Sequence, residues 1–146
     1  MKRKIAAAAV AIGVLAGPAG CGDPDQQMLT EGARAAREAA SEVRTARLAA
    51  QSLLDHKVWP QPATVVVTDA EQAIGTVASA FDQRQPGTDE SRQTYDQYSD
   101  ALVAAQDGVT ELRIALHRDD LAAVAQQVDQ LGRTADQLVR LGERAK

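Results

Sequence analysis

Residues 95–141 read YDQYSDALVAAQDGVTELRIALHRDDLAAVAQQVDQLGRTADQLVRL. Apolar or small side chains recur there at alternating intervals of three and four residues: Tyr95, Tyr98, Leu102, Ala105, Val109, Leu112 and Leu116, then Leu121, Val124, Val128, Leu131, Ala135, Leu138 and Leu141. This spacing places each set on one face of an α-helix. Because the second helix starts again at Asp119 or Asp120, directly after His117 and Arg118 end the first, the stretch predicts an antiparallel helical hairpin.

Two further stripes of the same spacing lie upstream. They comprise Leu29, Ala33, Ala36, Ala40, Val43, Ala50 and Leu54, with Arg47 as an interruption, and then Val67, Ala70, Ile74, Val77 and Phe81. Pro60 and Pro62 are expected to end the first of these helices, because proline lacks an amide hydrogen and restricts the residue before it. The segment 86–88 breaks the chain again, with Thr88 as the expected cap of the next helix.

The start of the second helix has two interpretations. Thr68 and Glu71 have the spacing of a capping box, which favours a start near Asp69, with the run Val65–Val67 leading into it. If Pro62 lies in the first turn instead, the helix is nearly two turns longer.

These helices predict an all-α fold, an antiparallel four-helix bundle over residues 28–146 with helices at about 27–57, 63–83, 89–117 and 120–144. Alanine accounts for 29 of the 146 residues, and 22 of these alanines follow Cys21. Small side chains at the seams let helices approach closely. We therefore expect a thin bundle with little room for a cofactor.

The first residues, MKRKIAAAAVAIGVLAGPAGCG, have the order of a secretory signal: a basic start and then an uncharged stretch over 5–20. As a helix, this stretch is about 24 Å long, short of the roughly 30 Å hydrocarbon core that a permanent anchor must cross. It is followed by Ala19, Gly20 and the chain's only cysteine, Cys21.

This ending resembles the lipobox of bacterial lipoproteins, although Pro18 stands where a branched aliphatic residue is usual. The resemblance implies a signal peptide over 1–20, a diacylglyceryl (palmitate-type) lipid on Cys21, a lipidated tether over 21–27 and an extracytoplasmic domain on the cell membrane. Arginine and alanine are abundant and lysine is scarce, as in GC-rich actinobacteria. The alternatives are plain secretion with cleavage after Ala19 and an uncleaved anchor.

Charge and composition exclude several classes of function. Removal of the signal with Lys2, Arg3 and Lys4 takes the formal charge from −4 to −7, which opposes binding to nucleic acid. One cysteine and two histidines exclude a zinc finger, and the chain lacks the Glu-x-x-His pairs of a di-iron bundle and the ligand pattern of a haem bundle. We expect no metal and no cofactor.

No catalytic residues are identified. His56 and His117 lie at helix ends, and no nucleophile motif accompanies them. Glu111 and His117 fall on different helix faces. Asp96, Asp100 and Asp107 share one face of the third helix, which favours a solvated acidic surface over a cation site.

The aromatic residues are few. Trp59 lies in the longest connection, where we expect it to cover the open end of the bundle; the alternative is an anchor for a partner protein, because tryptophan is enriched at binding hot spots. Tyr95 and Tyr98 are expected in the core, with their hydroxyls at the rim.

Together these features predict a lipid-anchored, non-enzymatic interaction or scaffold module, with an envelope protein as an unidentified partner. Two other functions stay open. One is a lipoprotein that binds a small apolar ligand between its helices, and the other is a self-associating, coiled-coil-like envelope protein.

Overall fold

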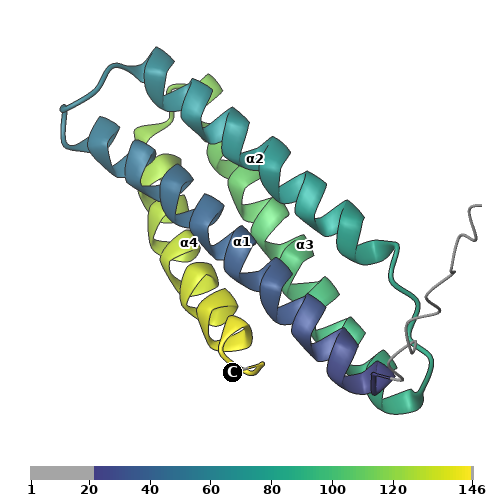
Figure 1. The fold of residues 1–146 in the computed structure, drawn as a ribbon. Coiled ribbons are helices and arrows are strands. Elements are labelled where there is room, and N and C mark those ends of the chain that lie inside the picture. Colours follow the sequence, from purple (N-terminus) through teal and green to yellow (C-terminus); the bar gives the residue numbers. More distant parts are fainter. Residues whose placement is uncertain (1–21, 146) are drawn as a thin grey trace, which may run out of the picture.

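The computed structural model describes residues 22–145, so the predicted signal peptide and Cys21 lie outside the described residues. The described residues form four helices, α1 (Pro24–Leu54), α2 (Pro60–Asp82), α3 (Asp89–His117) and α4 (Leu121–Gly142), packed as an antiparallel bundle (Figure 1). The predicted all-α fold is confirmed. Across residues 22–145, the structure contains no helix whose length and hydropathy would suit a membrane span.

Polar caps begin three of the helices. The Asp23 carboxylate accepts a hydrogen bond from the Asp25 amide at 3.0 Å and starts α1, so that residues 24–27 are helical and not part of a tether as predicted. Thr88 caps α3 as predicted, in a capping box with Ser91. Asp120 caps α4 by accepting from the Ala123 amide at 3.0 Å. Each cap satisfies an amide that has no partner within the helix.

The start of α2 follows the longer of the two interpretations. Pro60 occupies the first helical position, where a missing amide hydrogen costs no hydrogen bond. Thr68 therefore lies inside the helix and donates its hydroxyl to the Thr64 carbonyl at 2.8 Å. The predicted capping box of Thr68 and Glu71 is wrong, because Glu71 instead bonds across to α3.

The helices are arranged as a flattened bundle. α1 and α3 contact each other across its centre, and each also contacts α2 and α4. In the described chain, no Cα atom of α2 lies within 8 Å of one in α4. Of the two pairs of diagonally opposite helices, α1 and α3 are thus in contact, while α2 and α4 lie apart on opposite sides (Figure 1).

Alanine makes this close approach possible. Of the 30 buried hydrophobic residues in the described chain, 14 are alanine, and half of these lie on α1. Gly32 of α1 also allows a close approach, because the ring of Tyr98 occupies the space that a Cβ at position 32 would need. Most of the larger fully buried side chains come from the other helices, in agreement with the predicted stripes: Val67, Ile74, Leu102, Val109, Leu112, Val124, Leu131 and Leu138.

Candidate interaction surface

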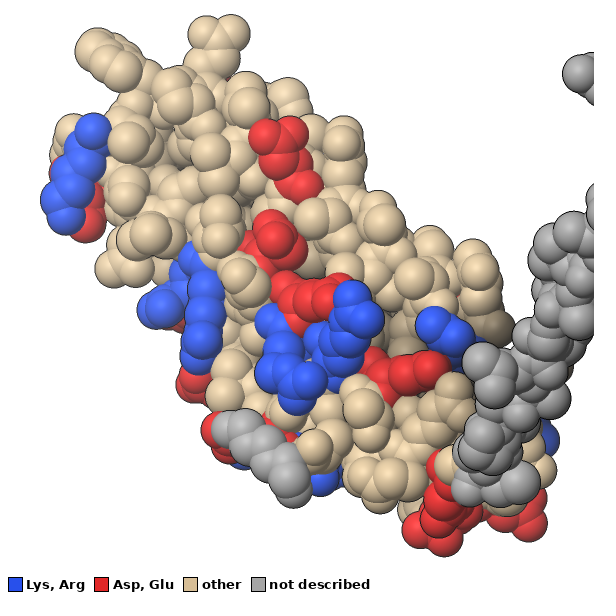
Figure 2. Space-filling view, in the orientation of Figure 1, with Lys and Arg blue, Asp and Glu red and all other residues tan. Residues whose placement is uncertain are grey.

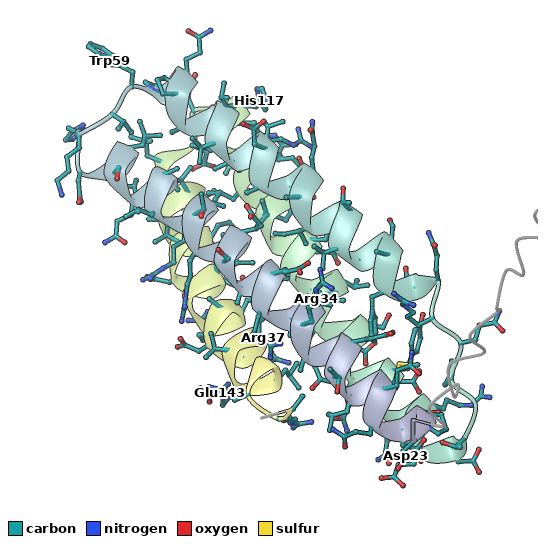
Figure 3. All side chains as sticks on the ribbon, viewed as in Figure 1. Asp23, Arg34, Arg37, Trp59, His117 and Glu143 are labelled. Carbon is teal, nitrogen blue, oxygen red and sulfur yellow. The ribbon has the colours of Figure 1, made fainter. Side chains whose placement is uncertain are left out.

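Trp59 lies at the end of the bundle opposite Asp23 (Figure 3). Its side chain is 80% exposed, so the expectation that it covers the end of the core is wrong. Leu53, Ala63 and Leu116 are buried in the terminal turns of α1, α2 and α3 and already fill that end. Trp59, as the N-cap residue of α2 with an extended backbone, is left on the surface.

A groove of about 500 Å³ lies against Trp59, where α1 ends and α2 and α4 begin. Its lining is mostly apolar: Leu53, His56, Lys57, Val58, Trp59, Pro60, Asp119 and Leu121. The predicted place of Leu121 in the core, with the stripe of α4, is wrong, because its side chain is 51% exposed. Leu121 is the first residue of α4, and it helps to form the groove.

Both connections at this end are held by backbone hydrogen bonds. His56 has a φ of 57°, and the following Lys57 amide donates to the Ser52 carbonyl at 2.9 Å. Asp119 has a φ of 53°, and the Asp120 amide donates to the Ala115 carbonyl at 3.1 Å. These are left-handed helix ends of the kind usually made by glycine. Sequence reasoning did not foresee them, because no glycine marks either position.

The charged groups that line the groove differ in their pairing. The Lys57 ammonium lies 2.9 Å from an oxygen of Asp55. Among the described residues, no hydrogen bond or ion pair involves the Asp119 carboxylate. The groove thus combines an exposed indole, an apolar floor and one carboxylate that no described side chain neutralises.

Charge is distributed unevenly over the bundle. α2 and α3 together carry nine acidic and two basic residues, whereas α1 and α4 carry six of each. Figure 2 shows basic side chains gathered over α1 and a surface over α2 that is mostly uncharged. The formal negative charge of the described chain therefore belongs mainly to the α2 and α3 side.

The predicted acidic face of α3 is present. Asp96, Asp100 and Asp107 are all exposed, as are Glu111 and His117. Within residues 22–145, no three His, Cys, Asp or Glu side chains are grouped so that they could hold a metal ion. These residues form a solvated surface.

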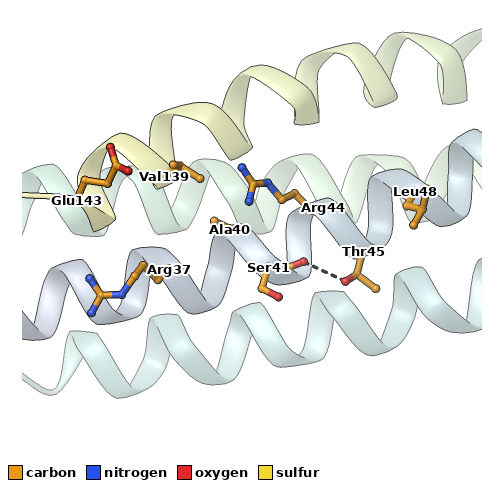
Figure 4. Close-up of a pocket in the computed structure, with 8 residues that line it drawn as sticks. All are labelled: Arg37, Ala40, Ser41, Arg44, Thr45, Leu48, Val139 and Glu143. Atoms are coloured by element: carbon orange, nitrogen blue, oxygen red, sulfur yellow. Dashed lines mark hydrogen bonds between the residues drawn. The ribbon is translucent and has the colours of Figure 1, made fainter.

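A second groove runs between α1 and α4, and it is lined by Arg37, Ala40, Ser41, Arg44, Thr45, Leu48, Val139 and Glu143 (Figure 4). Arg37 of this groove donates to the Gly142 carbonyl of α4 at 2.5 Å.

Arg47, which interrupts the apolar stripe of α1, donates to the Val128 carbonyl of α4 at 3.1 Å. Arg47 lies against Gly132, where a Cβ would lie 3.4 Å from its Nε. The interruption of the α1 stripe by Arg47 is thus an inter-helix contact.

One ion pair joins α2 to α3 in a half-buried position. The Arg113 Nε donates to Glu71 at 2.6 Å, and the Thr110 hydroxyl donates to its other carboxylate oxygen at 2.7 Å. Burial alone would raise the pKa of Glu71, but the hydrogen bonds from Thr110 and Arg113 and the charge of Arg113 lower it below the ordinary value.

The two tyrosines differ in burial. Tyr98 is fully buried, and its hydroxyl, expected at the rim, donates to the Leu141 carbonyl at 2.9 Å. Burial raises the pKa of Tyr98, and the positive charges of Arg144 and Arg37 oppose this increase.

Tyr95 is half-buried. Its ring stacks on Phe81 with ring centroids 5.2 Å apart, and its hydroxyl donates to Asp82 at the surface.

The fold and these surfaces define the class, an all-α antiparallel four-helix bundle with an exposed tryptophan at one end. No protein-family model, curated protein or solved structure matches the chain.

Proposed function

We propose that this protein is a membrane-anchored lipoprotein of the cell envelope whose helical domain is a non-enzymatic interaction module. Lipid on Cys21 attaches the chain to the extracytoplasmic face of the membrane. At its far end the bundle presents Trp59 and the groove beside it, here called the Trp59 surface, to a partner protein. The proposal for Cys21 rests on the sequence before it, and the proposal for Trp59 rests on its exposure.

The observation that carries the proposal is the separation of Asp23 from Trp59. Asp23 caps α1 only two residues after Cys21, and α1 then runs for 31 residues, about 46 Å, before the connection that contains Trp59. A short link to the anchor and a rigid bundle would hold the Trp59 surface away from the membrane. Such a spacer suits recognition of another envelope component.

A small apolar ligand at the centre of the bundle has less support. The contact of α1 with α3 occupies the space that such a ligand would need. Self-association through the apolar stripes also has less support, because nearly all stripe residues of α3 and α4 are buried within one chain.

The anchor is tested by expression of the full chain in a bacterial host fed with labelled palmitate. We expect the wild type to carry the label and to partition into the detergent phase, and Cys21→Ala to lose both properties. Ser41→Ala, a surface change on α1, is the matched control and should keep the label. A secreted wild-type protein with an unmodified Cys21 would contradict the anchor.

The interaction surface is tested in intact cells with a photo-crosslinking phenylalanine analogue at position 59. We expect a discrete adduct from position 59 and none from position 107 on the acidic face of α3. Equal adducts from both positions would show that neither surface is specific.

A further inference from the structure

We infer that the groove beside Trp59 binds a basic, partly apolar peptide segment, with an arginine or lysine of the partner stacked on the indole and paired with the Asp119 carboxylate. This inference deepens the proposed interaction function and rests on it. It names the chemistry of the partner, which the position of Trp59 alone does not.

The indole is the first element of the site. Trp59 is 80% exposed and forms one wall of the groove, so the described chain leaves its ring accessible to a ligand. Tryptophan offers the best aromatic face for a cation, and guanidinium groups are its commonest partners. Because Pro60 follows Trp59 and begins α2, little backbone freedom is lost on binding.

The carboxylate of Asp119 supplies the charge complementarity. The Lys57 ammonium, which lines the groove beside His56, is already paired with Asp55, whereas no described side chain forms an ion pair with Asp119. A basic segment therefore fits the groove better than an acidic one.

The apolar floor determines what flanks the cation. Leu53, Val58, Pro60 and Leu121 are half of the residues that line the groove, and Leu121 is half exposed. An aliphatic residue next to the arginine or lysine would cover these side chains and remove apolar surface from water. The expected ligand is thus an apolar–basic–apolar sequence in an extended conformation.

Trp59 is the only tryptophan in the chain, so its fluorescence reports directly on the groove. The experiment titrates the full chain in detergent with the peptide acetyl-Gly-Leu-Arg-Leu-Gly-amide. The comparison peptide replaces arginine by citrulline, which keeps the shape and removes the charge. We expect a saturable change in emission in the millimolar range or below, with the citrulline peptide at least threefold weaker.

Two variants assign the charge to its position. Asp119→Asn keeps the shape of the side chain, and asparagine tolerates the left-handed backbone at this residue. It should weaken the arginine peptide about two- to fivefold, as for an exposed ion pair, and leave the citrulline peptide unchanged. Asp107→Asn removes the same charge from the distant acidic face and should leave both affinities unchanged.

Several results would overturn the inference. These are no saturable change with the arginine peptide, equal affinity for the citrulline peptide, or equal weakening by Asp119→Asn and Asp107→Asn. A change in emission on concentration of the chain alone would identify a second copy as the occupant. The lipid anchor plays no part in this titration, so failure here leaves the anchor proposal standing, and loss of palmitate labelling would leave the groove proposal standing.

Discussion

Gly32 of α1 and the ring of Tyr98 of α3 are in direct contact between the two helices: a Cβ at position 32 would lie 2.5 Å from Cδ2 of that ring. The ring cannot easily move away, because Tyr98 is fully buried and its hydroxyl is bonded to the Leu141 carbonyl of α4. One aromatic residue thus joins α1, α3 and α4. The absence of a side chain at Gly32 is what allows α1 to approach α3 here.

Gly32→Ala should therefore destabilise the protein. Overpacking of a closed core costs about 1–3 kcal/mol, which outweighs the gain of up to about 1 kcal/mol from replacing a helical glycine. Gly75→Ala is the matched control, because a Cβ there would meet only the Gln106 side chain at 3.6 Å, and it should raise stability. Denaturant unfolding of both variants measures the difference, and equal stabilities would contradict the contact.

Tyr98→Phe should lower the free energy of unfolding by about 1 kcal/mol, the usual value of a buried neutral hydrogen bond. Tyr95→Phe should cost less, because its hydroxyl bonds to Asp82 at the surface. The measurement is thermal or denaturant unfolding at neutral pH. A larger loss for Tyr95→Phe would contradict the assigned contacts.

The stability of the wild type should also fall at alkaline pH. The pKa of Tyr98 is raised in the folded state above its ordinary value of 10, chiefly by burial. Its contribution is therefore complete below pH 10 and is lost as the pH rises through the folded pKa. Unfolding measured from pH 8 upward should show a steeper decline for the wild type than for Tyr98→Phe. Parallel declines would contradict the raised pKa.

The sequence predicted the helices and most of their buried faces, because the three–four periodicity depends on local positions alone. It did not predict which diagonally opposite helices are in contact, namely α1 and α3, because each apolar stripe could pack against more than one neighbouring helix. Gly32 shows the difficulty, because its role depends on Tyr98, which is 66 positions further along the chain.

The candidate site was predicted in part. Trp59 was identified from its type and its place beside Pro60, but its exposure depends on how well Leu53, Ala63 and Leu116 fill the end of the core. Asp119 was interpreted only as a helix start. Its place in the groove follows from the left-handed turn after α3, which the residues Asp119 and Asp120 do not reveal by themselves.

The ion pair of Glu71 and Arg113 should make stability fall in acid. Because the pKa of Glu71 is lowered in the folded state, its contribution is complete above the ordinary value of 4.5 and is lost as the pH falls through the folded pKa. Glu71→Gln should cost about 1–2 kcal/mol at pH 7 and flatten this decline. Asp107→Asn, an exposed change on α3, is the control for unfolding measured from pH 7 to pH 3. An unchanged acid profile in Glu71→Gln would contradict the shift.

Trp59 should contribute little to folding, in contrast to the buried aromatic Phe81. Since its side chain is 80% exposed, Trp59→Ala should change the free energy of unfolding by no more than about 0.5 kcal/mol, as for other surface substitutions. Phe81 is 3% exposed and stacks on Tyr95, so Phe81→Ala should cost about 3–5 kcal/mol. Acrylamide should quench the emission of the native wild type almost as efficiently as that of the unfolded chain. A large loss of stability in Trp59→Ala, or protection from acrylamide, would mean that the indole does pack on the end of the core, and the surface proposed for a partner would then be closed.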